Sequence, residues 1–180
     1  MDIVTWWFWG LLLVVLVALY LNQTAGRLDR LHIRVDNARA ALDEQLLLRA
    51  AAVSDLATSG LLDPASSLVL AEAAHEARVA VPWHREQPQS DLTEVLLASF
   101  ADARDVAELR TEPGGRVLVD ELADGARRVQ LARRFLDDAV RSCARVRVRP
   151  MVRWLRLAGR APWPQSLTFA DEVPPALAAP

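Results

Sequence analysis

The chain has 180 residues, a length typical of one domain with additional terminal segments. All 21 basic residues are arginine, which excludes chemistry that needs a lysine of this chain, such as a Schiff base or the lysine of a phosphate-binding loop. The single cysteine excludes an internal disulfide and a cysteine-rich zinc site. The formal net charge of −2 conceals an uneven distribution of charge along the chain.

The N-terminal segment is apolar, because residues 3–21 contain no charged side chain. A helix of this length reaches about 28 Å, close to the hydrocarbon thickness of a bilayer. Trp6, Trp7 and Trp9 lie near one end and Tyr20 near the other, and such rings prefer the two headgroup levels of a membrane. A cleaved signal peptide would begin with basic residues, which are missing here. The sequence therefore predicts a retained transmembrane helix.

Arginines flank this helix on one side only. None precedes it, whereas Arg27, Arg30, Arg34 and Arg39 follow it. Arginine-rich flanks stay in the cytoplasm according to the positive-inside rule. We therefore expect a single-pass protein of the cell membrane, with its N-terminus outside and the rest of the chain in the cytoplasm.

The body of the chain has the hydrophobic period of amphipathic helices. Apolar residues recur at three- and four-residue steps from Leu28 to Leu56, and at heptad-like spacing from Leu118 to Val146. Gly60 and a turn at Pro113 separate these long helices from the chain between them. Four helices are predicted: residues 27 to about 58, which can continue the transmembrane helix, 64 to about 80, 91 to about 110, and a fourth that follows the turn at residues 113–115 and carries the apolar residues from Leu118 to Val146.

Four amphipathic helices with short connections favour an antiparallel bundle. We therefore predict an all-α protein in which the transmembrane helix is followed by an elongated antiparallel four-helix bundle. Residues 1–26 form the anchor and a short link, residues 27–149 the bundle, and residues 150–180 a basic amphipathic segment with a proline-rich tail. The last part of that tail, residues 162–180, is expected to be loosely ordered. In up-down order the fourth helix returns to the membrane.

Charge is segregated between the bundle and its C-terminal end. Residues 27–138 contain 14 arginines and 20 acidic residues, whereas residues 139–170 contain seven arginines and no acidic residue. After Pro150, apolar and basic side chains follow opposite sides of a short helical pattern, which is typical of a segment at a membrane surface. Anionic lipid attracts each such arginine by about 1 kcal/mol. The predicted membrane-surface residues are Arg145, Arg147, Arg149, Arg153, Trp154, Arg156 and Arg160.

These arginines have two other interpretations. They can form the solvated face of the fourth helix and its frayed end. Nucleic-acid binding is not expected, because aromatic residues are few in the basic segment and no recognition motif is present.

Candidate residues for chemistry are sparse. Glu72 and His75 have the spacing of a di-iron motif, but the predicted fourth helix offers no histidine to complete such a site. Cys143 falls on the apolar stripe of that helix, where a buried small residue is expected rather than a nucleophile. No catalytic residue, cofactor or metal site is predicted.

Two stretches resemble proteins of the LemA family. Residues 31–46, with the sequence LHIRVDNARAALDEQL, resemble the first soluble helix of that family, and residues 132–141, ARRFLDDAVR, resemble its last helix. Leu136, Cys143 and Ala144 replace polar residues that are typical of the family's last helix. The resemblance implies a bacterial, membrane-anchored helical bundle with a mostly cytoplasmic body. It implies no catalytic residues, because the molecular role of the family is unsettled.

These patterns together predict a non-catalytic membrane-anchored scaffold or adaptor. Its expected partners are a bilayer with anionic lipid and either an unknown membrane protein or a second copy of the chain. The alternative function is binding or remodelling of the membrane surface through the arginine-rich C-terminal segment. The candidate interaction surface combines polar residues of the first and fourth helices of the bundle, which could equally form solvated faces and interhelical salt bridges: Asp36, Asn37, Asp43, Gln45, Arg49, Arg133, Arg134, Asp137 and Asp138.

Overall fold

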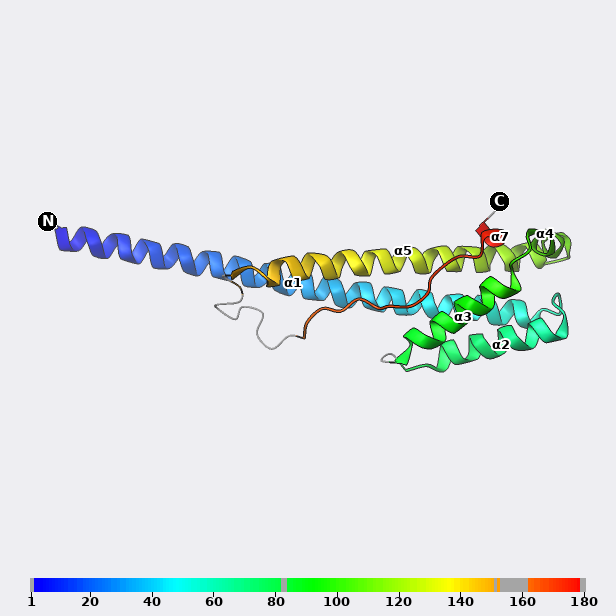
Figure 1. Ribbon diagram of the computed structural model, residues 1–180. Helices are drawn as coiled ribbons and strands as arrows, with labels where there is room; N and C mark the ends of the chain where they lie inside the picture. The colour runs from blue at the N-terminus through cyan, green and yellow to red at the C-terminus, as the bar shows by residue number, and fades with distance from the viewer. Residues whose placement is uncertain (1, 82–83, 151, 153–161, 179–180) are drawn as a thin grey trace. The chain divides into compact units, whose positions relative to one another are not determined.

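A computed structural model describes residues 2–81, 84–150, 152 and 162–178 (Figure 1). The described residues form helices and no strand, which confirms the predicted all-α class. The helices are α1 (Asp2–Thr58), α2 (Pro64–Val79), α3 (Glu86–Ser99), α4 (Ala103–Thr111), α5 (Gly115–Arg147) and α7 (Pro175–Ala178).

The chain divides into two compact units. Unit 1 comprises residues 1–38 and 137–165, and unit 2 comprises residues 39–136 and 166–180. Helices α1 and α5 each contribute to both units.

Helix α1 continues from the apolar N-terminal segment into the body of the chain without a break, as the sequence suggested. It ends before Gly60, whose φ of 77° lies in the left-handed region that glycine adopts without strain. Asp63 then caps α2 through its carboxylate, which accepts hydrogen bonds from the amides of Ala65 (2.9 Å) and Ser66 (3.1 Å). Pro64 occupies the first helical position. An N–H group at this position would have no hydrogen-bond partner within the helix, so proline costs no bond there.

The prediction of one helix over residues 91–110 is wrong, because two helices, α3 and α4, cover this part of the chain. Helix α3 begins five residues earlier, at Glu86, and Pro88 lies in its first turn, where proline breaks no intrahelical bond. The helix stops at Phe100, whose side chain is buried in the core. Asp102 then caps the separate helix α4 by accepting a hydrogen bond from the amide of Arg104 at 2.8 Å.

The start of α5 requires glycine. A Cβ atom on Gly115 would lie 1.9 Å from the carbonyl oxygen of Leu109 in α4. This close approach, together with the φ of 82° at Gly114, allows the chain to turn directly from α4 into α5.

All helices of unit 2 contribute to one hydrophobic core. The predicted apolar stripes of the two long helices supply fully buried side chains, among them Val53 and Leu56 of α1 and Leu122 of α5. Helix α2 packs against α3, and α4 contacts α7. The remaining core residues from the shorter helices are mostly leucine and alanine: Leu70, Ala73, Ala74, Ala77, Leu92, Leu96, Phe100, Val106, Ala176 and Leu177.

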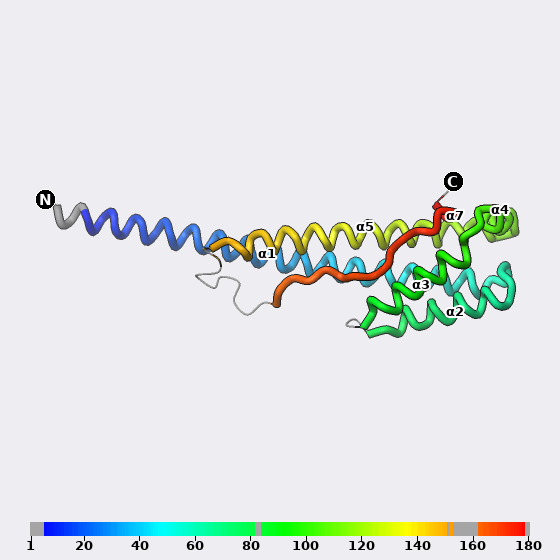
Figure 2. The backbone as a smooth tube through the Cα atoms, in the orientation of Figure 1, coloured from blue at the N-terminus to red at the C-terminus, as the bar shows by residue number. Residues whose placement is uncertain are grey.

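The C-terminal tail is not loosely ordered over residues 166–178, in contrast to the prediction. We call residues 166–174, which precede α7, the C-terminal strap. The strap runs between α3 and α5 in unit 2 (Figure 2). Leu177 anchors its end, because this side chain is only 1% exposed and belongs to the core. The strap is thus fixed at its C-terminal end by the core of unit 2.

In unit 1, the end of α5 lies beside α1. The Nε2 atom of His32 is 3.3 Å from the guanidinium of Arg147. Leu28 and Val35 of α1 are buried in this unit, as are Ala139, Cys143 and Val146 of α5, which is the side predicted from the heptad-like spacing.

Candidate functional site

The N-terminal part of α1 presents a continuous apolar surface. Trp6 is 81% exposed and Leu16 is 55% exposed. This segment is the single one in the described residues that is long and apolar enough to cross a membrane. Large contiguous apolar patches of this kind are rare on soluble monomers. The exposed large side chains are Trp6, Trp7, Phe8, Trp9, Leu11, Leu12, Leu13, Val14, Val15, Leu16, Val17, Leu19 and Tyr20.

The predicted membrane-surface arginines differ in their surroundings. Arg145 and Arg149 are exposed. Arg147 is half-buried, donates a hydrogen bond to the carbonyl oxygen of Pro162 and lies 4.9 Å from the centre of the Trp163 ring. Four predicted members of this set lie outside the described residues: Arg153, Trp154, Arg156 and Arg160.

The residues of the candidate interaction surface are divided between the two units. Four of its nine residues belong to unit 1 and five to unit 2. In unit 1, Asp36, Asn37 and Asp138 are exposed, and Asp137 is half-buried. Asp138 forms an ion pair with Arg141 one turn further along α5. This pair agrees with the alternative interpretation, in which these residues form a solvated helix face.

The members of the set in unit 2 include a residue that is not on the surface at all. Arg49 is 1% exposed, because α1 turns this face toward α3 and α5. Asp43 is engaged in an ion pair with Arg85 at 2.9 Å. Gln45 is half-buried, and its side-chain oxygen is buried without a hydrogen-bond partner in the described structure. The prediction of Arg49 as a surface residue is therefore wrong.

Arg49 is instead the centre of a buried polar cluster. Its guanidinium donates hydrogen bonds to the hydroxyl of Thr93 (3.0 Å), and to the carbonyl oxygen (3.1 Å) and side-chain oxygen (2.7 Å) of Gln89. Burial lowers the pKa of Arg49 to about 10, an effect that Asp171 opposes electrostatically. The group thus remains protonated at neutral pH and needs negative or polar surroundings.

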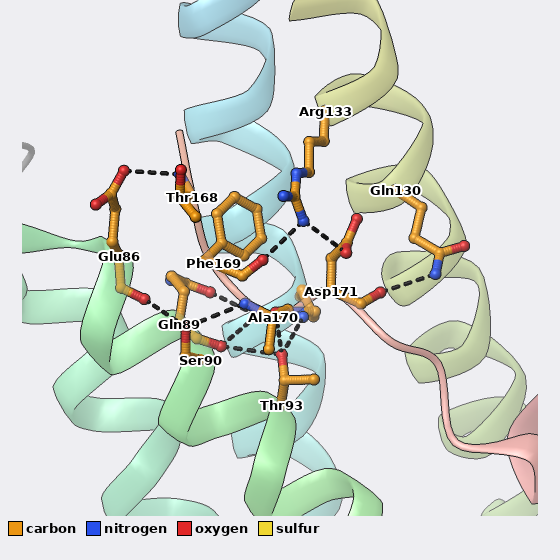
Figure 3. A network of polar contacts seen from close by, with 11 residues as sticks. Glu86, Gln89, Ser90, Thr93, Gln130, Arg133, Thr168, Phe169, Ala170 and Asp171 are labelled. Carbon is orange, nitrogen blue, oxygen red and sulfur yellow. Dashed lines mark hydrogen bonds and ion pairs between the residues drawn. The ribbon is translucent and has the colours of Figure 1, made fainter. Parts of the chain in front are cut away.

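The polar cluster continues into the C-terminal strap, which is held from both sides (Figure 3). From α3, Glu86 accepts a hydrogen bond from the amide of Thr168 (2.8 Å) and Ser90 accepts one from the amide of Ala170 (3.1 Å). The hydroxyl of Thr93 donates to the carbonyl oxygen of Ala170 (2.8 Å). Each contact from α3 therefore uses an even-numbered residue of the strap.

The contacts from α5 use the odd-numbered residues. Arg133 donates to the carbonyl oxygen of Phe169 (2.7 Å) and to the carboxylate of Asp171 (2.6 Å), and its guanidinium lies 5.0 Å from the centre of the Phe169 ring. Gln130 donates to the carbonyl oxygen of Asp171 (2.8 Å). This alternation follows from the two-residue period of an extended chain.

Sequence reasoning missed most of this network. Of its members, only Arg49 and Arg133 were among the predicted site residues. Residues 81–89 read as a break between helices, which concealed Glu86 and Gln89 at the start of α3. Asp171 and Glu172 are the first acidic residues after Asp138. Their negative charge was the one sequence signal that this part of the tail could contact arginines.

The described surface of unit 2 is hollowed in places. One hollow, of about 630 Å³, is lined by charged side chains of α4 and α5 and by the end of α7: Arg110, Arg116, Asp120, Asp124, Arg127, Leu177 and Ala178. Its charges are paired with one another, as in Arg116–Asp120 and Arg127–Asp124. Another, of about 440 Å³, has an apolar floor that includes Leu62 and Phe100 and an acidic rim that includes Asp105 and Glu108.

The remaining chemical candidates are accounted for by their surroundings. Glu72 and His75 are exposed on α2. Within the described ranges, no group of three or more histidine, cysteine, aspartate or glutamate side chains is arranged to hold a metal ion. Cys143 is fully buried, and burial raises the pKa of its thiol. This matches the expected buried small residue.

Comparison with known proteins adds no relative. No protein-family model matches the chain, and neither a curated protein nor a solved structure matches it.

Proposed function

We propose that this protein is a single-pass, membrane-anchored scaffold or adaptor of the LemA type, with its helical body in the cytoplasm. The observation that carries the proposal is the continuity of α1. The same helix is exposed and apolar over residues 6–20 and supplies buried core residues from Leu42 to Leu56. One helix therefore belongs both to the proposed anchor and to the core of unit 2.

The LemA-type arrangement remains part of the proposal. The two stretches that resemble the family lie on α1 and α5, the two long helices that supply most of the predicted apolar stripes. An antiparallel four-helix arrangement is consistent with the contact between Arg147 and His32 in unit 1, because the C-terminal end of α5 there meets an early part of α1.

A non-catalytic role is proposed because the polar side chains that the structure brings together hold segments of the chain to each other. Arg133 and Gln130 bind the backbone of the strap, and Arg85 binds Asp43. Such contacts build a rigid body that can present surfaces to partners.

The anchor can be tested by extraction of the full chain from membranes. Leu13→Arg combined with Leu16→Arg places two charges in the proposed span, each of which disfavours insertion by about 2.5–3.5 kcal/mol. We expect the wild-type chain to remain in the membrane pellet at alkaline pH and the double variant to become extractable. Leu47→Arg with Leu48→Arg is the matched control, since both leucines are exposed on α1 outside the span.

Orientation is tested separately by reporters fused to the C-terminus. A reporter that is active only in the cytoplasm should be active, and one that is active only outside the cell should be silent. The reverse pattern would contradict the proposed orientation and leave the anchor itself unaffected.

The second candidate function is binding of the membrane surface by the arginine-rich end of α5. It is favoured by the position of Arg147 beside His32, which lies only 11 residues after Leu21, or about 16 Å along α1. Arg145→Gln with Arg149→Gln should weaken binding of the chain to vesicles that contain anionic lipid, by about tenfold or more. Arg128→Gln with Arg134→Gln, at exposed positions of unit 2, is the matched control.

A further inference from the structure

The strap is bound mainly through its backbone. Five backbone groups of residues 168–171 accept or donate hydrogen bonds, and each partner is a side chain of α3 or α5. Backbone recognition of an extended chain is how many proteins bind peptides, with affinity from the main chain and specificity from alternate side chains. The groove between α3 and α5 therefore has the organisation of a peptide-binding site.

Two side chains of the strap supply the specific contacts. Phe169 is 6% exposed and lies against the guanidinium of Arg133. Asp171 pairs with the same guanidinium and acts electrostatically on the buried Arg49. The pattern recognised is thus an aromatic residue followed two positions later by a carboxylate.

The site is built around a buried cation. The Nε atom of Arg49 is buried without a hydrogen-bond partner in the described structure, and the hydrogen bonds that Arg49 does make go to neutral oxygens of Gln89 and Thr93. A buried guanidinium with neutral neighbours favours a carboxylate nearby. Asp171 supplies this negative charge from the strap.

We propose that the groove between α3 and α5 binds an extended acidic peptide of a partner protein, and that the C-terminal strap occupies this groove as an internal competitor. The inference goes beyond the proposed function, because it concerns unit 2 alone and holds whether or not α1 spans a membrane. The partner segment presents a Phe-x-Asp pattern in extended conformation. Residues 166–174 belong to neither α3 nor α5, so the strap can leave the groove without unwinding either helix.

A competitor that belongs to the same chain acts at a high effective concentration. A free peptide therefore binds weakly while the strap is in place and binds well once the strap is weakened. Arg133 belongs to the groove, so its loss removes binding in both states.

The test uses the full chain in detergent and a fluorescent peptide with the sequence of residues 164–178. Phe169→Ala with Asp171→Ala weakens the strap and leaves the groove unchanged. We expect this variant to bind the peptide at least about tenfold more tightly than the wild-type chain does. The same peptide with alanine in place of its own Phe and Asp should not bind, and adding Arg133→Ala to the weakened variant should abolish binding.

The proposal would be overturned if the Phe169→Ala, Asp171→Ala variant is folded, as cooperative unfolding would show, and yet binds no peptide or binds it no better than the wild-type chain does. A second measurement covers the case in which that variant fails to fold. In the wild-type chain, the amides of Thr168 and Ala170 should exchange with solvent through an opening that leaves the amides of residues 50–57 protected. Exchange of all these amides only on global unfolding would show that the strap does not leave the groove.

Discussion

The guanidinium of Arg133 lies 2.6 Å from the carboxylate of Asp171, so a side chain of α5 holds a residue of the C-terminal strap. The same guanidinium also binds the carbonyl oxygen and the ring of Phe169. One arginine thereby joins the strap to α5 through three kinds of contact.

Arg133→Ala should destabilise the chain by about 1–2 kcal/mol, because it removes two hydrogen bonds and a cation–π contact at a half-buried position. Arg134→Ala is the control, since Arg134 is the exposed next residue of the same helix and its loss should change stability by less than about 0.5 kcal/mol. Urea unfolding followed by circular dichroism measures both. Equal losses in the two variants would show that the Arg133 contacts contribute nothing.

Arg49→Met tests the buried polar cluster. The apolar side chain fills a similar space but leaves the side-chain oxygen of Gln89 without its donor, so we expect a loss of about 1–3 kcal/mol. Adding Gln89→Met removes the orphaned group, and the double variant should lose less than the two single variants summed. Arg34→Met, at an exposed position, serves as the control. Strict additivity of the two single changes would contradict the coupling seen in the structure.

Gly115→Ala should destabilise the chain by about 1–3 kcal/mol or more, because its Cβ would collide with the carbonyl oxygen of Leu109. Gly26→Ala is the matched opposite case. It lies inside α1 with no heavy atom near the new Cβ, so the substitution should stabilise the helix by about 0.5–1 kcal/mol. Thermal unfolding of both variants measures the difference, and a stabilising Gly115→Ala would refute the turn geometry.

Cys143 should be protected from alkylation in the folded chain. Burial raises the pKa of the thiol above its ordinary value of 9.0, so both the access and the thiolate needed for reaction are reduced. The control variant is Cys143→Ala with Val148→Cys, which moves the thiol to a residue that is 55% exposed. Rapid labelling of native Cys143 would contradict its burial.

The same thiol predicts a dependence of stability on pH. The folded state retains the proton at pH values where the unfolded thiol, with a pKa near 9.0, has lost it. Its contribution to stability is therefore fully present below pH 9 and is lost as the pH rises through the higher folded pKa. Cys143→Ala should lack this loss. An identical fall in stability for the variant and the wild-type chain above pH 9 would exclude the thiol as its source.

The sequence was sufficient for the elements whose signals are periodic. The apolar run of α1 and the heptad-like stripe of α5 extend over many turns. A single residue that departs from the pattern therefore does not change the predicted helix. The break at Phe100 was not predictable in this way, because the core selects that side chain through contacts between helices that are distant in the sequence.

The candidate site was harder to predict for a related reason. Arg49 and Arg133 were predicted as polar residues of helix faces. The hydrogen-bond partners of Arg49 in the cluster lie at least 40 residues away in the sequence, and those of Arg133 lie at least 36 residues away. The strap was missed because five prolines in residues 162–180 suggested a loose tail, whereas side chains of α3 and α5 hold it in place. Long-range pairing of an extended segment has no local signature in a single sequence.

The adaptor role is tested most directly by cross-linking the tagged full chain in intact membranes, followed by mass spectrometry of the purified products. We predict one dominant partner protein at near-equal stoichiometry with this chain. Products that contain only self-links and lipid, repeated under stress conditions, would contradict the adaptor role and favour a direct action on the membrane surface.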